Sequence, residues 1–420
     1  MSERTRNVAT ALISCFGLLA VVQAYWQVIA SPALTDTFFD RHSELLAKIA
    51  QPGSITTADG QQVLVPVKTN GQWLFRYEMP KEFAHITGYN ARTGLQGKLV
   101  AALYGKPPYS DWKQQLLAGR PRGSTIELTV NSAVQRHAAE LLGERPGCAI
   151  VIRVKDAAVL AAVSSPSYDC VEIGADPTAL EIAETDPTEP LTFRPIQKLY
   201  APGWAMAWVT AAAALENLRA SQELDCDGAW RLGTLTVECH RAHGRVDVAR
   251  AVEYGCKVGI AQLAHEMGPD VLRATIKRLH LLDAANMFLD SVPGKMPDFY
   301  SWRGPRNLIE AALGTREARL TPLAVARFFL CVARGGTVVQ PYLIRSIVSP
   351  GGKVWMEGGP RVLGQGLSPS TSAMLMDLLT RTAASLPLED NAILGGGGLA
   401  AVAWWHGDAA QRFAKGESFF

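Results

Sequence analysis

An uncharged run near the N-terminus constrains this chain more than any other feature of its sequence. From Val8 to Ile29 there is no charged side chain, and an apolar run of this length can cross a bilayer as a helix. Arg4 and Arg6 precede the run, and positive charge marks the cytoplasmic end of such helices. The sequence therefore predicts a single-pass protein of the cytoplasmic (inner) membrane, with residues 1–7 inside and the chain from residue 30 onwards outside.

A cleaved secretory signal is the alternative that the same run allows. Val22-Gln23-Ala24 fits the small-residue pattern of a cleavage site. The apolar stretch continues beyond that site, which favours an uncleaved anchor. Either interpretation exports the rest of the chain.

The composition favours a globular protein with more than one domain. The chain has 420 residues, of which 48% are hydrophobic, so it can bury a sizeable core. A net charge of +2 gives no case for a nucleic-acid partner. We predict neither a cofactor nor a metal ion, because the pairs Cys239/His240 and His240/His243 are too tight and too isolated for a zinc site.

Two cysteines bracket a predicted hairpin. Cys226 and Cys239 flank residues 227–238, which have the pattern of two short strands turned at a glycine. Outside the membrane such a pair can form a disulfide. Two free buried thiols are the alternative, and the sequence leaves both open.

Local signals define the segments in the first half of the chain. Thr125–Val130 alternates as a strand, and Asn131 is a suitable N-cap for a helix that runs to Gly143. The apolar runs Cys148–Val154 and Val159–Val163 are typical of two paired strands.

An Ala-rich helix begins after residues 194–203, a loop that ends in Pro-Gly. The next residues are Trp204-Ala205-Met206-Ala207. This stretch resembles the entry to the catalytic helix of the penicillin-binding proteins, where the run ends Pro-Gly-Ser-x-x-Lys. Trp204 stands at the serine position and Ala207 at the lysine position. An acyl-serine enzyme needs a hydroxyl nucleophile and a base, and neither side chain supplies one.

Further landmarks of that family occur in order from residue 51 to about residue 409. Four blocks resemble the membrane-anchored (class B) penicillin-binding proteins: Pro52–Leu64, His85–Gln96, Leu128–Asp169 and Ala312–Pro341. The resemblance implies an α+β fold, with a small pedestal of residues 30–125 and a transpeptidase-like domain of residues 126–420. In that domain, which is also the fold of β-lactamases, an antiparallel sheet packs with helices.

The family's other two motifs also lack their chemical groups in this chain. Gly255-Cys256-Lys257 stands where the family has Ser-x-Asn, and Cys256 is expected to face the core. Lys257 is expected to be a solvated lysine and not a migrated base. Gly396, Gly397 and Gly398 fall in the run that matches Lys-Thr-Gly. The run Ala403-Trp404-Trp405-His406-Gly407 resembles the Ala-Trp-Phe-x-Gly strand that follows it.

The C-terminus is expected to be shorter than in the family. Residues Gln411–Phe420 are too few for both the last central strand and the long helix that the family has there. A sheet edge near Phe419 and Phe420 would then need a partner to cover it.

The resemblance, with its three emptied motifs, implies a catalytically inactive relative that acts as a scaffold or regulator in peptidoglycan synthesis. Its implied partner is a polytopic glycan polymerase or another wall-synthesis protein, reached through the membrane span and the pedestal. Two alternatives stay open. One is an active D,D-transpeptidase that uses another nucleophile, such as Ser164, Ser165 or Ser301, although none has a lysine three residues on. The other is a sensor that binds a muropeptide or a β-lactam without a covalent bond.

Overall fold

The computed structural model has the predicted α+β architecture and describes residues 3–25, 50–105, 122–301, 304–315, 317–384 and 399–405. The helices are α1 Glu3–Ala24, α3 Ala84–Thr87, α4 Gly94–Lys98, α5 Val100–Leu103, α7 Ser132–Leu142, α8 Cys170–Ala175, α9 Pro177–Thr185, α10 Arg194–Gln197, α11 Ala205–Glu216, α12 Val248–Glu253, α13 Lys257–Met267, α14 Pro269–Arg278, α15 Gly304–Ala312, α16 Pro322–Ala333 and α17 Pro369–Ala384. The strands are β1 Ile55–Thr56, β2 Gln62–Thr69, β3 Gln72–Tyr77, β4 Thr125–Leu128, β5 Gly147–Arg153, β6 Val159–Ser165, β7 Leu224–Cys226, β8 Ala229–Leu232, β9 Leu235–Glu238, β10 Gly244–Val246, β11 Thr337–Gln340, β12 Ile344–Val348, β13 Val354–Glu357, β14 Arg361–Gln365 and β15 Leu399–Trp405.

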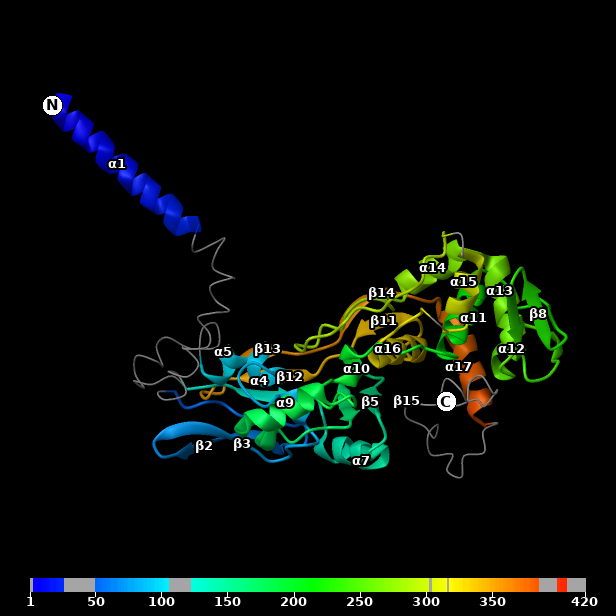
Figure 1. Cartoon of the computed structure of the whole chain (residues 1–420), viewed down its shortest axis with the longest axis horizontal. Coiled ribbons are helices and arrows are strands. Elements are labelled where there is room, and N and C mark those ends of the chain that lie inside the picture. Colours follow the sequence, from blue (N-terminus) through cyan, green and yellow to red (C-terminus); the bar gives the residue numbers. More distant parts are fainter. Residues whose placement is uncertain are drawn as a thin grey trace.

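A six-stranded sheet lies at the end of the molecule that carries β2 and β3 in Figure 1. Its strand order is β13-β12-β4-β1-β2-β3, with β1 parallel to β4 and β12 antiparallel to β4. The predicted alternation of β4 is confirmed, since Ile126 and Leu128 are fully buried. Glu127 lies between them and accepts a hydrogen bond of 2.6 Å from Ser346 on β12. The predicted domain boundary between residues 125 and 126 therefore falls inside one continuous sheet.

The middle of the molecule is a three-stranded antiparallel sheet with the order β15-β5-β6. The paired strands β5 and β6 confirm the sequence prediction for this hairpin. Helix α7 precedes them and starts as predicted, because Asn131 Oδ1 accepts from the backbone N–H groups of Ala133 and Val134. Helices α7, α10 and α16 pack against this sheet.

Helices α11 to α15 and α17 gather at the opposite end from β2 and β3 (Figure 1). Their shared core includes Ala207, Cys256, Ile260 and Phe328, all with 2% or less of their surface exposed. The Ala-rich sequence of α11 lets its neighbours approach closely, and α12, α13, α14, α15 and α17 all contact it. The hairpin β8–β9 projects beside α13 at the outer edge of this end.

The pedestal is tied to the rest of the chain through His85 on α3. Its Nε2–H donates to the carbonyl oxygen of Pro190 at 2.7 Å. The imidazole ring stacks on Phe193 and meets Tyr168 edge-on, at centroid separations of 5.7 and 5.0 Å. Removal from water lowers the pKa of His85 to about 4. This contact joins segments more than one hundred residues apart in the sequence.

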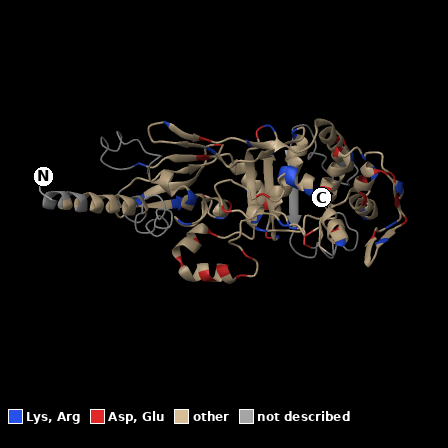
Figure 2. Cartoon of the chain, turned by 90° about the horizontal axis from the view of Figure 1, so that it is seen from above, with Lys and Arg blue, Asp and Glu red and all other residues tan. Residues whose placement is uncertain are grey.

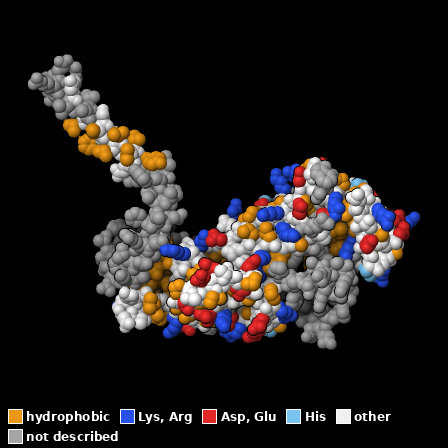
Figure 3. Space-filling view, viewed as in Figure 1, with side chains coloured by type: hydrophobic (Ala, Val, Ile, Leu, Met, Phe, Trp, Pro, Cys, Tyr) orange, Lys and Arg blue, Asp and Glu red, His pale blue; other side chains and the backbone are white. Residues whose placement is uncertain are grey.

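The N-terminal helix α1 carries apolar side chains on its surface (Figure 3). Ile13, Phe16 and Val21 are each about 70% exposed. Among the residues that the structure describes, none of the helices is long and apolar enough to cross a membrane. Residues 26–29 of the predicted span Val8–Ile29 lie outside the described residues.

Lys and Arg residues and Asp and Glu residues are interspersed along the described elements in Figure 2. Residues 406–420, on which the prediction of a shortened C-terminus rests, lie outside the described residues.

Candidate functional site

The loop before α11 is fixed by backbone contacts with the segment that precedes α16. Tyr200 and Leu320 exchange two backbone hydrogen bonds of 2.9 Å each, and the N–H of Gly203 donates to the carbonyl oxygen of Gly314 at 3.0 Å. A Cβ on Gly314 would lie 2.1 Å from the oxygen of Gly203, so only glycine allows this approach. The start of α11 is therefore held in a defined position.

Trp204 is the N-cap residue of α11, and Ala207 is the third residue of the helix. Trp204 is half-buried, has helical backbone angles and makes no side-chain cap. It packs against the helical core, in which Ala207 is completely buried. The position at which the family has its lysine is therefore buried in the helical core and does not line a solvent-filled cleft. At this helix start the chain offers an indole ring and a methyl group, and no hydroxyl and base.

The second motif position lies in the turn between α12 and α13. Asp247 caps α12 by accepting from the backbone N–H of Arg250 at 2.8 Å. Cys256 is fully buried, as predicted, and its Sγ caps α13 by accepting from the N–H of Gly259 at 3.2 Å. Lys257 is half-buried at the first position of α13.

Gly255 has a left-handed backbone, with φ of 65°. An L-residue with a Cβ is strained there by about 1–2 kcal/mol. The glycine at this position therefore suits the local turn, and a serine would not adopt it without strain. Because α11 packs on both α12 and α13, the fold brings the first two motif positions into one core, as the resemblance implies.

The third motif position itself lies outside the described residues, but the strand that follows it is described. Gly396, Gly397 and Gly398 lie outside them. The strand that follows, β15, runs antiparallel to β5 from the Leu399–Arg153 pair to the Trp405–Gly147 pair. Leu399, which follows the glycines that match Lys-Thr-Gly, and Ala403–Trp405, from the run that resembles the Ala-Trp-Phe-x-Gly strand, thus belong to a single strand. The resemblance implies two separate strands here.

The serines considered as alternative nucleophiles are engaged elsewhere. Ser164 Oγ donates to the carbonyl oxygen of Thr192 at 2.8 Å, and Ser165 Oγ to that of Gly143 at 2.8 Å. Ser301 Oγ donates to the carbonyl oxygen of Asp298 at 3.1 Å. A hydroxyl that already donates to a backbone carbonyl is not held for deprotonation by a base.

A hollow of about 560 Å³ opens beside the helical core. Its lining residues are Lys295, Met296, Glu317 and Arg319. Lys295 and Arg319 exchange two backbone hydrogen bonds at its base. None of the described motif residues lines this hollow.

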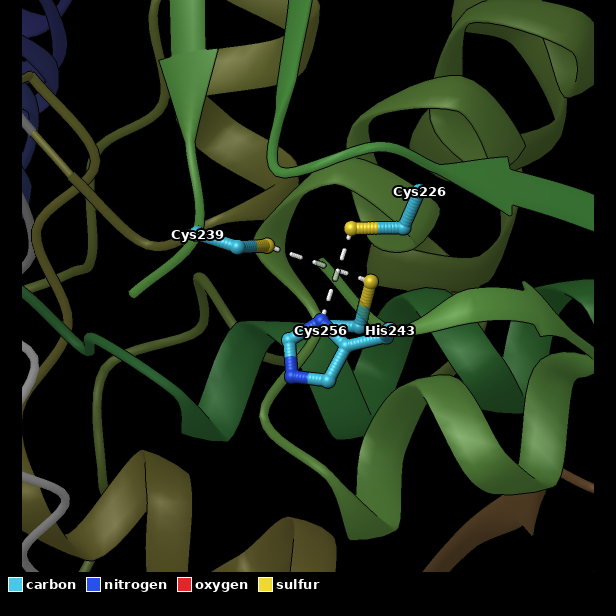
Figure 4. Close-up of side chains that lie close together, drawn as sticks. All are labelled: Cys226, Cys239, His243 and Cys256. Carbon is cyan, nitrogen blue, oxygen red and sulfur yellow. Dashed lines mark hydrogen bonds between the residues drawn. The ribbon is translucent and has the colours of Figure 1, made fainter. Parts of the chain in front are cut away.

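The structure also gathers residues that the sequence analysis kept apart. Cys226 at the end of β7, Cys239 after β9, His243 before β10 and Cys256 form one cluster (Figure 4). The hairpin β8–β9 between the first two cysteines is confirmed. The sequence left a disulfide and two free thiols open as alternatives, and the structure has the free thiols. The hairpin delivers each sulfur to a different neighbour. Cys226 Sγ lies 3.4 Å from His243 Nδ1, and Cys239 Sγ lies 3.9 Å from Cys256 Sγ.

The cluster perturbs the ionisation of its thiols. The hydrogen bond with Cys256 is the main factor that lowers the pKa of the Cys239 thiol, and the backbone N–H of Val258 adds to the effect. The same hydrogen bond raises the pKa of Cys256. Adjacent pairs such as Cys239/His240 do not indicate the cluster. The sequence signal for it is the wider spacing of Cys226, Cys239, His243 and Cys256. That spacing brings the four side chains together only because β7 pairs with β10.

Known proteins with similar sequences and structures include penicillin-binding proteins. The penicillin-binding protein transpeptidase domain family matches residues 147–389. The chain is 27% identical to the peptidoglycan D,D-transpeptidase PbpA of Mycolicibacterium smegmatis, over 90% of this chain and 82% of that protein. It is 25% identical to PbpA of Mycobacterium tuberculosis, over 83% and 76%. Penicillin-binding protein A from M. tuberculosis, solved as a penicillin G acyl-enzyme complex, matches with a TM-score of 0.73 at 26% identity, over 81% and 84%. Since the family match covers more than half of the chain, this chain belongs to the penicillin-binding protein transpeptidase domain family.

Proposed function

We propose that this chain is a transpeptidase-like protein of peptidoglycan synthesis that forms no acyl-serine intermediate and acts by binding. The observation that carries the proposal is the start of α11, where Trp204 replaces the nucleophile and Ala207 is sealed in the core. A covalent route needs a nucleophile and a group that accepts its proton. Loss of both removes the reaction and does not merely slow it.

The remaining motif positions support the same proposal. Gly255 replaces the hydroxyl of the second motif in a turn that favours glycine. The alternative serines have their hydroxyl hydrogens committed to backbone carbonyl oxygens. A positioned acid–base group or oxyanion donor contributes on the order of 10² to 10⁴ in rate. The chain lacks such groups at the motif positions that the structure describes.

The proposal predicts that β-lactams do not acylate the protein. The full chain, purified in detergent, is incubated with a large excess of penicillin G, and its intact mass is measured. We expect an unchanged mass. PbpA of M. smegmatis treated in parallel is the positive control. A stoichiometric mass increase on this chain would contradict the proposal and return the search for a nucleophile to the remaining serines.

The second part of the proposal concerns location and partner. The uncharged run Val8–Ile29 and the exposed apolar side chains of α1 support a membrane anchor with its N-terminus inside. With catalysis lost, the anchor and the pedestal are the surfaces through which the chain would bind a polytopic wall-synthesis protein.

Photo-crosslinking in intact cells tests this partner. Crosslinkable residues in the anchor should capture a wall-synthesis protein that mass spectrometry identifies. Replacing Val8–Ile29 by an unrelated single span should abolish the capture, while protease resistance shows that the outer domain stays folded. Equal capture after the swap would mean that the span is an anchor only.

A further inference from the structure

The cluster of Cys226, Cys239, His243 and Cys256 has the composition of a metal site. One potential ligand atom from each residue lies within 4.8 Å of all the others. The four side chains come from separate segments and point toward a common centre (Figure 4). Cys226 and Cys256 are buried, and the other two are half-buried. The cluster is thus enclosed by protein and still reachable from solvent.

Two of the separations between ligand atoms match a tetrahedral ion. With zinc–sulfur bonds of about 2.3 Å, a tetrahedron places two sulfurs about 3.8 Å apart, and a sulfur and a nitrogen about 3.6 Å apart. The two sulfurs of Cys239 and Cys256 are 3.9 Å apart, and Cys226 Sγ and His243 Nδ1 are 3.4 Å apart. Both pairs agree with that geometry to within a few tenths of an ångström.

The surroundings of the cluster favour charged sulfurs. Two backbone N–H groups in the first turn of α13 point at them: that of Val258 donates to Cys239 Sγ at 3.4 Å, and that of Gly259 donates to Cys256 Sγ at 3.2 Å. The positive end of the helix dipole acts in the same direction. The His243 ring is held between Tyr254, which stacks on it, and His240, which meets it edge-on.

We propose that Cys226, Cys239, His243 and Cys256 bind one zinc ion as a closed structural site. Three thiolates and one imidazole are a ligand set that zinc prefers, and a set of four protein ligands leaves no open position for catalysis. The ion would join the hairpin β8–β9, the short β7–β10 pair and the turn at Gly255 to the start of α13. Two-stranded sheets are marginally stable alone, so a cross-link at their base would fix them. This inference does not depend on the proposed loss of catalysis.

A disulfide is the competing use of the same cysteines. Any one disulfide would use two of the three thiols and leave the third with a histidine beside it. A zinc ion uses all four side chains at once. The two alternatives also differ in mass, because a disulfide removes two hydrogens from the chain and zinc binding to thiolates removes none after the metal is stripped.

Metal content measured on the full chain tests the proposal. The protein is purified in detergent without chelator or added metal, and zinc is counted by plasma mass spectrometry. We expect about one zinc ion per chain. Cys256→Ser and His243→Asn should each lower it to below about a tenth of an ion. The matched controls His240→Asn and Cys331→Ala lie beside the cluster and in the core, and should keep their zinc.

A measurement on the unmodified chain keeps the test valid where a variant does not fold. Cobalt exchanged into the protein should give the intense near-ultraviolet band of thiolate–cobalt bonds and the visible bands of a tetrahedral ion. An organomercurial that titrates the thiols should release the metal ion in proportion to the thiols that have reacted. Zinc-free protein with a disulfide among the three cysteines would overturn the proposal. So would zinc that persists in the two ligand variants, because it would be bound elsewhere.

Discussion

Single residues decide whether the family's reaction is available to this chain. Ala207 has no exposed surface and sits among apolar side chains of α11 and its neighbours. A lysine there would place an ammonium group in a core that has closed around a methyl group. Reversal of the change is therefore a problem of packing as well as of chemistry.

Ala207→Lys should lower the free energy of unfolding on the order of 3 kcal/mol or more, through overpacking and burial of a charge without a partner. Ala205→Lys, on the same helix but half-buried, is the matched control. Its long side chain can reach water, so we expect a loss below about 1 kcal/mol. Urea unfolding of both variants checks the difference. Equal losses would show that the Ala207 position can open.

Elements with strong local signals formed as the sequence predicted. Asn131 caps α7, the strands β5 and β6 pair, and β8 and β9 form the hairpin between Cys226 and Cys239. Each depends on residues close together in the chain. The bounds of β15 were predicted wrongly, because an apolar run does not reveal where one strand ends and the next begins.

The N-cap of α7 offers a direct measure of one such local signal. Asn131→Ala should lower the free energy of unfolding by about 1 kcal/mol, since two backbone N–H groups lose their acceptor. Asn131→Ser keeps a capping oxygen and should lose only a small part of that. Thermal unfolding of the two variants makes the comparison. A neutral alanine variant would mean that water replaces the cap.

At the scale of the whole molecule, distant segments combine in ways that local patterns do not reveal. One of the two sheet partners of β4, the strand β12, lies more than two hundred residues further along. The cluster of Cys226, Cys239, His243 and Cys256 likewise depends on the pairing of β7 with β10, which brings the sulfurs and the imidazole close together. Sequence periodicity identifies strands but not their partners. This is why the family and many elements were predicted, whereas the shared sheet and the cluster were not.

Because the pedestal shares a sheet with the rest of the chain, we expect it to be necessary for folding. A fragment of residues 126–420 would lack β1–β3 and expose the side of β4 that pairs with β1. We expect it to aggregate or to unfold without a cooperative transition, whereas residues 50–420 should unfold cooperatively. Urea titration followed by circular dichroism separates the two. Cooperative unfolding of the shorter fragment would show that the predicted boundary at residue 126 is a true domain boundary.

The contact between the pedestal and the rest of the chain should respond to acid. The pKa of His85 in the folded protein is about 4, below the value of about 6.5 in an unfolded chain. Between these values the unfolded state binds more protons, so stability falls as the pH drops from about 6.5 to about 4. The loss attributable to His85 approaches the order of 3 kcal/mol below that window.

His85→Gln isolates this contribution. Glutamine can still donate to the carbonyl oxygen of Pro190 but does not titrate. The carboxyl groups are the same in both proteins, so the difference between their stability–pH curves belongs to His85. We expect a flatter curve for the variant between pH 6.5 and 4. Parallel curves would mean that His85 is not the acid-sensitive group.

The central place of β4 also sets an order of events during synthesis. The ribosome releases β4 long before β12, which follows it by more than two hundred residues. Until then one edge of β4 has unpaired backbone groups, which invite pairing with other chains. Folding with such long-range pairing is slow. We therefore expect the nascent chain to need shielding along Thr125–Leu128 until β12 has been made.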